Sequence, residues 1–234
     1  MFDRHEHPQI ASLPHASPRL RLAVASLTLL LSACSNLSTS PDWQLQQQTA
    51  DIDYFTRQSS VRSLPEFRAT IEVKATIPQV MAVLTDFSRQ PDWVYRCREL
   101  RVIALKGYSE VFLYQINDLP IIADRDLILH GQTITSDDGG ELRIRLEAVP
   151  DYCDNNDDED CIAINQSNKV RVQQARGEFI LTKKDQSSTT IVWQQFLDPG
   201  GALPHWLFRM MLADVPIKSL SQLKRLLEQE NNPQ

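Results

Sequence analysis

A regular pattern of apolar residues runs through the last part of the chain. Between Asp198 and Leu227 these residues recur at spacings of three and four, which predicts a long amphipathic helix. A turn with the sequence Asp-Pro-Gly-Gly at residues 198–201 precedes the helix, and Pro216 predicts a kink or a break partway along it. Such a helix must pack its apolar stripe against another element. The stripe comprises Leu203, Trp206, Leu207, Met210, Met211, Ile217, Leu220, Leu223 and Leu227.

Most of the preceding chain alternates between apolar and polar residues, as half-buried strands do. Pro78 starts a short helix that ends near Arg89-Gln90-Pro91, and turns at Lys106-Gly107 and residues 137–140 separate later strands. Because consecutive strands with short turns pair as hairpins, the sequence predicts an α+β fold in which a curved antiparallel β-sheet wraps around the long C-terminal helix. The expected strands are Ile52–Arg57, Phe67–Ala75, Leu100–Leu105, Glu110–Ile116, Arg125–Thr135, Glu141–Val149, Val170–Thr182 and Thr189–Leu197.

Residues 1–33 have the pattern of an export signal. Arg19 and Arg21 precede the apolar run Leu22–Leu31, which is too short to cross a membrane as a helix. The sequence Leu-Ser-Ala-Cys at residues 31–34 resembles the bacterial lipobox, so we expect Cys34 to carry a lipid anchor. A plain secretory signal is the alternative, and a true start downstream of Met1 would explain the unusual residues before Arg19.

The residue after this cysteine indicates a location. Ser35, in place of an aspartate, resembles the sorting pattern for the outer membrane, so we expect the protein on the periplasmic face of that membrane in the cell envelope. Residues 34–49 are polar and rich in glutamine, and they predict a tether that passes into a short helix.

An oxidising compartment would permit disulfides. Cys153 and Cys161 flank the acidic run Asp154–Asp160, which fits a solvated loop, a disulfide-stapled loop or a calcium loop. The calcium interpretation lacks the central glycine and the bidentate glutamate of an EF-hand. Cys97 is left over, and we expect it to be a small buried hydrophobe.

Four stretches stand in order along the chain: Asp51–Arg57 with Glu66–Thr76, Pro78–Trp93, Ile122–Leu127 and Asp198–Trp206. Together they resemble the START domain, the lipid-transfer branch of the helix-grip superfamily. The resemblance implies a lipid-binding domain over residues 50–230, with a cavity between the sheet and the C-terminal helix. Some sterol-binding relatives place a second arginine shortly after the Asp-Arg-Asp element, where this chain has Leu127–Gly131, so sterol specificity does not carry over.

Binding an apolar molecule needs a lining of apolar, adaptable side chains rather than reactive groups. Each methylene moved from water into a dry cavity contributes about 0.8 kcal/mol. Arg125, between two carboxylates, could contact a lipid headgroup or fix its strand, and any single candidate could also be ordinary core. The candidate ligand-binding residues are Trp93, Tyr114, Arg125, Ile144, Leu146, Phe179, Trp193, Leu207, Met210 and Met211.

Other classes of function find less support in the residues. The chain has a net charge of −6 and no basic stripe interleaved with aromatics, so no nucleic-acid partner is expected. After residue 33 only His130 and His205 remain, and phosphate-binding loops and nucleophile elbows are absent from the sequence, so we expect no metal, no cofactor and no catalytic residue. We expect a monomer whose partners are a lipid and the membrane that holds its anchor.

Two alternatives remain open. An enzyme of the same superfamily would use the cavity as a reaction vessel, and its acid–base groups would have to come from Asp124, Arg125, Asp126, Tyr114 and His130. A scaffold protein would have a filled core and would dock its partner through the acidic run Asp154–Asp160.

Overall fold

The structure, a computed structural model, describes residues 42–60 and 64–231. Its helical elements are α1 (Ile77–Thr85), the 3₁₀ turn η1 (Phe87–Arg89), α2 (Gln90–Trp93), α3 (Glu159–Asn165) and α4 (His205–Asn231). Its strands are β1 (Gln44–Gln48), β2 (Ile52–Gln58), β3 (Pro65–Val73), β4 (Cys97–Lys106), β5 (Glu110–Asn117), β6 (Arg125–Thr135), β7 (Glu141–Ala148), β8 (Val170–Arg171), β9 (Gln174–Lys183) and β10 (Thr189–Asp198).

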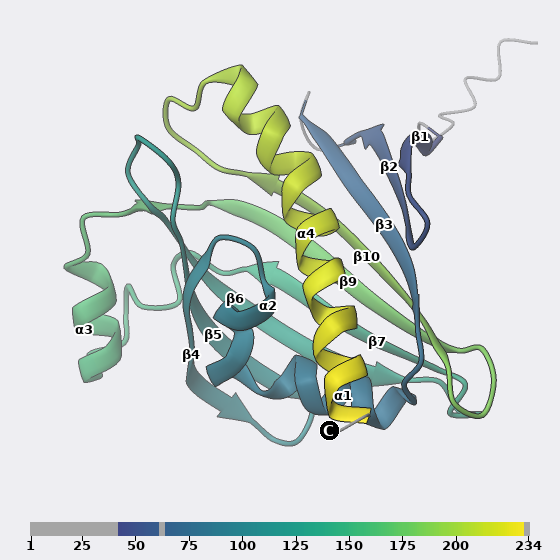
Figure 1. Cartoon of the computed structure of the whole chain (residues 1–234). Coiled ribbons are helices and arrows are strands. Elements are labelled where there is room, and N and C mark those ends of the chain that lie inside the picture. Colours follow the sequence, from purple (N-terminus) through teal and green to yellow (C-terminus); the bar gives the residue numbers. More distant parts are fainter. Residues whose placement is uncertain (1–41, 61–63, 232–234) are drawn as a thin grey trace, which may run out of the picture. The chain divides into compact units, whose positions relative to one another are not determined.

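The described strands form one ten-stranded sheet, which along its main path has the order β1-β2-β3-β10-β9-β7-β6-β5-β4. Neighbours on this path are antiparallel, and β3 pairs with β10, so the first strands join the last. Figure 1 shows α4 crossing one face of the sheet, with α1 and α2 on the same side. The predicted α+β helix-grip fold, a curved antiparallel sheet around a long C-terminal helix, is therefore confirmed.

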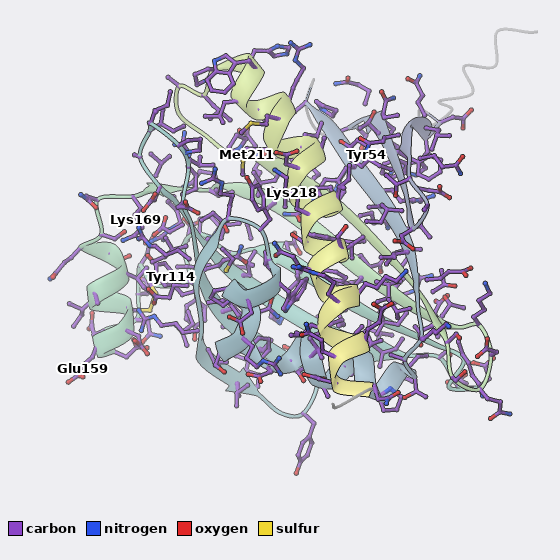
Figure 2. The ribbon with its side chains drawn as sticks, viewed as in Figure 1. Tyr54, Tyr114, Glu159, Lys169, Met211 and Lys218 are labelled. Carbon is purple, nitrogen blue, oxygen red and sulfur yellow. A yellow bond between two sulfur atoms is a disulfide. The ribbon has the colours of Figure 1, made fainter. Side chains whose placement is uncertain are left out.

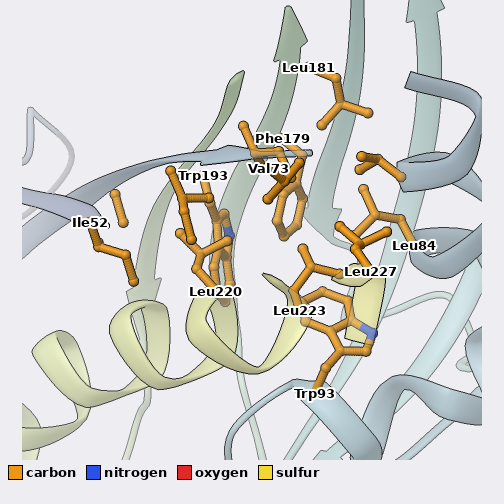
Figure 3. Close-up of a cluster of buried hydrophobic side chains, with 14 of the residues drawn as sticks. Ile52, Val73, Leu84, Trp93, Phe179, Leu181, Trp193, Leu220, Leu223 and Leu227 are labelled. Carbon is orange, nitrogen blue, oxygen red and sulfur yellow. The ribbon is translucent and has the colours of Figure 1, made fainter. Parts of the chain in front are cut away.

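The C-terminal half of α4 packs tightly on the sheet. Leu220, Leu223 and Leu227 are fully buried, and they share a core cluster with Val73 of β3 and Trp193 of β10 (Figure 3). Burying one such leucine contributes about 1.5–3 kcal/mol relative to leaving it exposed. This end of the predicted apolar stripe is confirmed. The stripe does not extend to Trp206, which is 54% exposed at the start of the helix.

Pro216 lies inside α4 without breaking it. A proline has no N–H, so the carbonyl of Leu212, four residues earlier, loses its partner within the helix. The hydroxyl of Tyr54, on β2, donates a hydrogen bond of 3.0 Å to that carbonyl. Tyr54 is buried, and its burial raises the pKa of the hydroxyl. The sheet thus supplies the donor that the proline removes.

Three segments differ from their sequence-based predictions. Residues 44–48 form the edge strand β1 and not a helix, because they pair with β2. The predicted strand Val170–Thr182 is divided: β8 pairs in parallel with the start of β6, whereas β9 lies between β7 and β10. Residues 90–93 form the additional short helix α2.

The acidic run is closed by a disulfide between Cys153 and Cys161 and continues into α3. Asp158 caps this helix by accepting a hydrogen bond of 2.7 Å from the N–H of Cys161, and Asp160 forms an ion pair with Arg101. The disulfide interpretation is therefore the one that the structure supports, and two residues of the acidic run that could have bound calcium, Asp158 and Asp160, have other partners. Cys97 is a buried free thiol as predicted, and burial raises its pKa to about 12.

The predicted export signal in residues 1–33 and the predicted lipidation site Cys34 lie outside the described residues. Within the described ranges, no helix combines the length and the apolar composition that crossing a membrane requires.

The Tyr54 hydrogen bond can be tested by a double-mutant cycle. Tyr54→Phe should lower the free energy of unfolding by about 1–3 kcal/mol, because it leaves the Leu212 carbonyl without a partner. In a Pro216→Ala background the restored N–H can take that carbonyl, so the same substitution should cost distinctly less. Urea unfolding of the four proteins measures the coupling. Equal costs in both backgrounds would contradict this account of Pro216.

Candidate ligand-binding cavity

A cavity of about 200 Å³ lies between the sheet and the helices α1, α2 and α4. Strands β5, β6, β7, β9 and β10 form its floor, and the N-terminal half of α4 covers it. The cavity exists because α4 fills the concave face only with its C-terminal half. The helix-side lining comprises Leu84, Phe87, Gln90, Trp93, Phe208, Met211, Leu212 and Val215.

The floor is polar at one end and apolar at the other. On β6, alternate residues face the cavity, and their neighbours across the ladder on β5 do the same, so each register pair forms one row. Arg125 lies opposite Asn117, Leu127 opposite Gln115, and Leu129 opposite Leu113.

An aromatic wall bounds another part of the cavity. Phe179 of β9 and Trp193 of β10 are stacked with ring centroids 5.0 Å apart, and Phe67 meets Trp193 edge-on at 5.2 Å. Trp93 of α2 packs edge-on against Phe179 at 6.4 Å. Ile144 of β7 lies opposite Phe179 in the ladder and lines the cavity beside it. Rigid aromatic and branched side chains of this kind form a preformed apolar surface.

One donor in this wall has no partner. Trp93 is 2% exposed, and its indole N–H makes no hydrogen bond in the described structure. Buried polar groups are usually paired. Trp93 lines the cavity, so an acceptor atom of a bound molecule would offset the cost of this unpaired group.

The guanidinium of Arg125 is held at the polar end by backbone carbonyls. It donates hydrogen bonds to the carbonyls of Pro199 at 3.2 Å, Gly200 at 3.1 Å and Ala123 at 2.5 Å. These bonds tie the start of β6 to the turn that leads into α4. Burial lowers the pKa of the Arg125 guanidinium, because the charged form has lost water.

The carboxylates that flank Arg125 have structural partners elsewhere. Asp124 pairs with Arg98. Asp126 is fully buried on the other face of the sheet, where it accepts two hydrogen bonds of 3.0 Å from Arg171 and one of 3.0 Å from the hydroxyl of Tyr114. Burial first, and the charge of Asp126 second, raise the pKa of Tyr114 to about 12. This network fixes β6, β8 and the disulfide region.

Seven of the ten candidate residues line the cavity: Trp93, Arg125, Ile144, Leu146, Phe179, Trp193 and Met211. Three do not. Tyr114 lies under α3, on the face of the sheet opposite to the cavity, whereas Met211 of α4 lies on the cavity side (Figure 2). Leu207 is buried but lies outside the lining, and Met210 is half-buried on another side of α4. Gln115 and Asn117 also line the cavity but were not among the predicted residues, although they alternate on one predicted strand.

The residues considered for an enzyme do not meet in this cavity. Asp124, Asp126, Tyr114 and His130 are absent from its lining, and no aspartate or glutamate of the described residues lines it. The Nε2 atom of His130 lies 3.0 Å from a carboxylate oxygen of Glu110. Within the described part of the chain, three or more potential metal ligands do not gather at any point.

A family model and a bacterial protein each match most of this chain. The model of the START domain matches residues 28–232. The uncharacterized protein PA1579 of Pseudomonas aeruginosa is 23% identical over 209 residues, which cover 88% of this chain and 98% of that protein.

Solved structures give the same picture. The STAR-related lipid transfer protein from Xanthomonas axonopodis is 26% identical, with a TM-score of 0.67 over 80% of this chain and 99% of that one. Human StAR-related lipid transfer protein 5 is 13% identical, with a TM-score of 0.70 over 81% of this chain and 88% of that one, a likeness that concerns the fold alone.

The two carboxylates beside Arg125 should differ sharply in their effect on stability. Asp126→Ala should lower the free energy of unfolding by about 3–5 kcal/mol, because it leaves the largely buried Arg171 without its partner. The matched control is Asp124→Ala, whose ion pair with the exposed Arg98 should contribute less than about 1 kcal/mol. Urea unfolding measures both values. Equal losses would contradict the structural role of the buried network.

Proposed function

Because this chain belongs to the START family, we propose that it is a non-catalytic protein that binds a lipid, or a molecule of similar apolarity, between the sheet and α4 and transfers it at a membrane. The observation that carries the proposal is the apolar cavity under the N-terminal half of α4. The similarity to a STAR-related lipid transfer protein supports it. The absence of carboxylates from the described cavity lining favours binding over acid–base catalysis.

The driving force would be the burial of an apolar chain. At about 0.8 kcal/mol per methylene, a long acyl chain offers on the order of 10 kcal/mol before the costs of ordering it. Sites for drug-sized ligands typically have about 300–1,000 Å³, more than the roughly 200 Å³ of this cavity. A long ligand therefore requires the lining to move, and Met211 is the kind of side chain that adapts.

The turn before α4 provides a place for that movement. Gly200 and Gly201 both have positive φ angles, 63° and 62°, which residues other than glycine rarely adopt. They connect β10 to the half of α4 that covers the cavity. Rotation about these glycines, together with a bend of α4 at Pro216, would lift this half of the helix, while the leucines of the other half keep it on the sheet.

Two exposed apolar residues flank the same end of the cavity. Ile121, in the β5–β6 loop, is 84% exposed with a φ of 63°, an unusual angle for a β-branched residue, and Trp206 stands exposed at the start of α4. The bonds from Arg125 to Pro199 and Gly200 join the ends of these two segments. We propose that Ile121 and Trp206 enter the membrane surface during transfer. Backbone strain of the kind seen at Ile121 is often found at functional sites, which agrees with this role.

The location and attachment of the protein belong to the same proposal. A lipidated Cys34 would hold the domain at the periplasmic face of the outer membrane, within reach of its ligand. One bound molecule needs one cavity, so a monomer suffices for this function.

A charge placed in the cavity should abolish ligand binding. Met211→Glu puts a carboxylate into the apolar lining and should weaken binding by at least about 100-fold, because a buried unpaired charge is costly. Met210→Glu is the matched control, since its side chain lies outside the lining. Native mass spectrometry with lipid extraction, on residues 35–234 purified from a bacterial envelope, measures occupancy.

Unfolding curves must show that both variants fold. Binding retained in a folded Met211→Glu protein would contradict the assigned cavity. If the wild-type protein carries no co-purifying lipid and does not bind added lipids, the result would favour the scaffold alternative, in which the acidic run is the docking site.

Membrane contact can be separated from binding by kinetics. The double variant Ile121→Asp with Trp206→Asp should slow lipid transfer between vesicles by about tenfold or more, because charged residues resist insertion into the bilayer surface. Its equilibrium affinity should be unchanged. Leu105→Asp with Tyr108→Asp is the matched control, since both residues are exposed at the other end of β5. Equal slowing by both pairs would count against a specific docking end.

A further inference from the structure

One cation in the wall of the cavity has no anionic partner among the described residues. Three arginines line the cavity, and no carboxylate of the described residues does. Arg96 pairs with Asp118 at 3.0 Å, and Arg176 pairs with Glu66 at 3.4 Å. Arg125 forms no ion pair with any described residue, although only 4% of it is exposed. A buried cation without a partner is costly, so this position needs an explanation.

Its hydrogen bonds position Arg125 but leave its charge unneutralised. The three carbonyl acceptors engage three of the nitrogen donors, whereas a guanidinium has five N–H groups. Arg125 lines the cavity, so its remaining N–H groups are on a side chain that a bound molecule can reach. The desolvation that lowers the pKa of Arg125 also means that an anion would meet a charge that water screens weakly.

The floor of the cavity changes from polar near Arg125 to apolar further along the strands, as an amphiphilic molecule does along its length. Asn117 lies directly across the ladder from Arg125, and Gln115 lies in the next row. Further along the same two strands the lining is Leu113 and Leu129. At about 3.3 Å per residue, roughly 13 Å separates Arg125 from Leu129 along β6. A molecule with a polar head and an apolar tail would match this floor from one end to the other.

We propose that Arg125 binds the anionic head of an amphiphile whose apolar chain occupies the cavity. This inference rests on the proposed function and names its ligand class. A carboxylate or a phosphate provides oxygens that a guanidinium can bind through two N–H groups. A long-chain fatty acid or the phosphate of a phospholipid would supply this chemistry.

The test compares ligands that differ only in the head. Hexadecanoate and hexadecanol have chains of the same length, and the acid is ionised in dilute solution at pH 8. The full chain, purified as the cell produces it, should bind the acid about 10- to 100-fold more tightly, the range expected for a charge-assisted hydrogen bond. Quenching of tryptophan fluorescence by brominated chains reports binding, since Trp93 and Trp193 line the cavity.

Variants then assign this preference to one residue. Arg125→Met should bind the two ligands with about equal affinity, whereas Arg125→Lys should keep part of the preference for the acid. Arg98→Met is the control, because Arg98 lies outside the lining and should leave the preference intact. The wild-type comparison stands even if a variant fails to fold.

Three results would overturn the inference or its premise. Equal wild-type affinities for acid and alcohol would refute the anionic head while leaving the lipid-binding proposal in place. A preference that persists in folded Arg125→Met would remove Arg125 from the role. Failure of both ligands to bind would end the proposed function and this inference together. If the preference is present, a lysophosphatidate tested beside the acid identifies the head, as phosphate or carboxylate, by which binds more tightly.

Discussion

The attachment of α4 to the sheet is the constraint on which the rest of the structure depends. Its C-terminal half is fixed by fully buried leucines, so the helix must cross the whole concave face. Its N-terminal half presents Met211, Leu212 and Val215 to a space that they do not fill. Interiors normally pack to the density of organic crystals, so a cavity persists only where rigid elements hold it open. Here the aromatic wall and the anchored helix do so.

The alternation of side chains along β6 separates two electrostatic environments. Asp126 turns away from the cavity and satisfies Arg171 and Tyr114 on the outer face. Arg125, one residue earlier, turns toward the cavity and finds only carbonyls. The period of two in a strand therefore places adjacent, opposite charges on opposite faces of a sheet. The same sequence, Asp-Arg-Asp, serves stability on one face and leaves a cation available on the other.

The sequence predicted most of the fold because its strands are amphipathic or bounded by clear turns. It predicted less of the site. The run Arg125–Leu129 is buried on both faces, so periodicity alone cannot say which face holds the cavity. Tyr114 and Arg125 were therefore assigned to one face, although the register places them on opposite faces. Met210 and Met211 are neighbours on a helix, and only the helix rotation distinguishes them. Strand β1 forms from glutamines because of its pairing with β2, a contact that local composition does not contain.

Arg125 links the polar end of the cavity to the turn before α4, which is the place of the proposed opening movement. Its guanidinium holds the carbonyls of Pro199 and Gly200, at the turn whose glycines precede α4. Lifting the N-terminal half of the helix would strain these bonds, and an anion bound to the same guanidinium would stabilise the arrangement that they require. Ligand and closed helix would then each favour the other, since both depend on one positioned cation. A chain without an anionic head would gain the burial energy but not this coupling, so it should leave the cavity more readily.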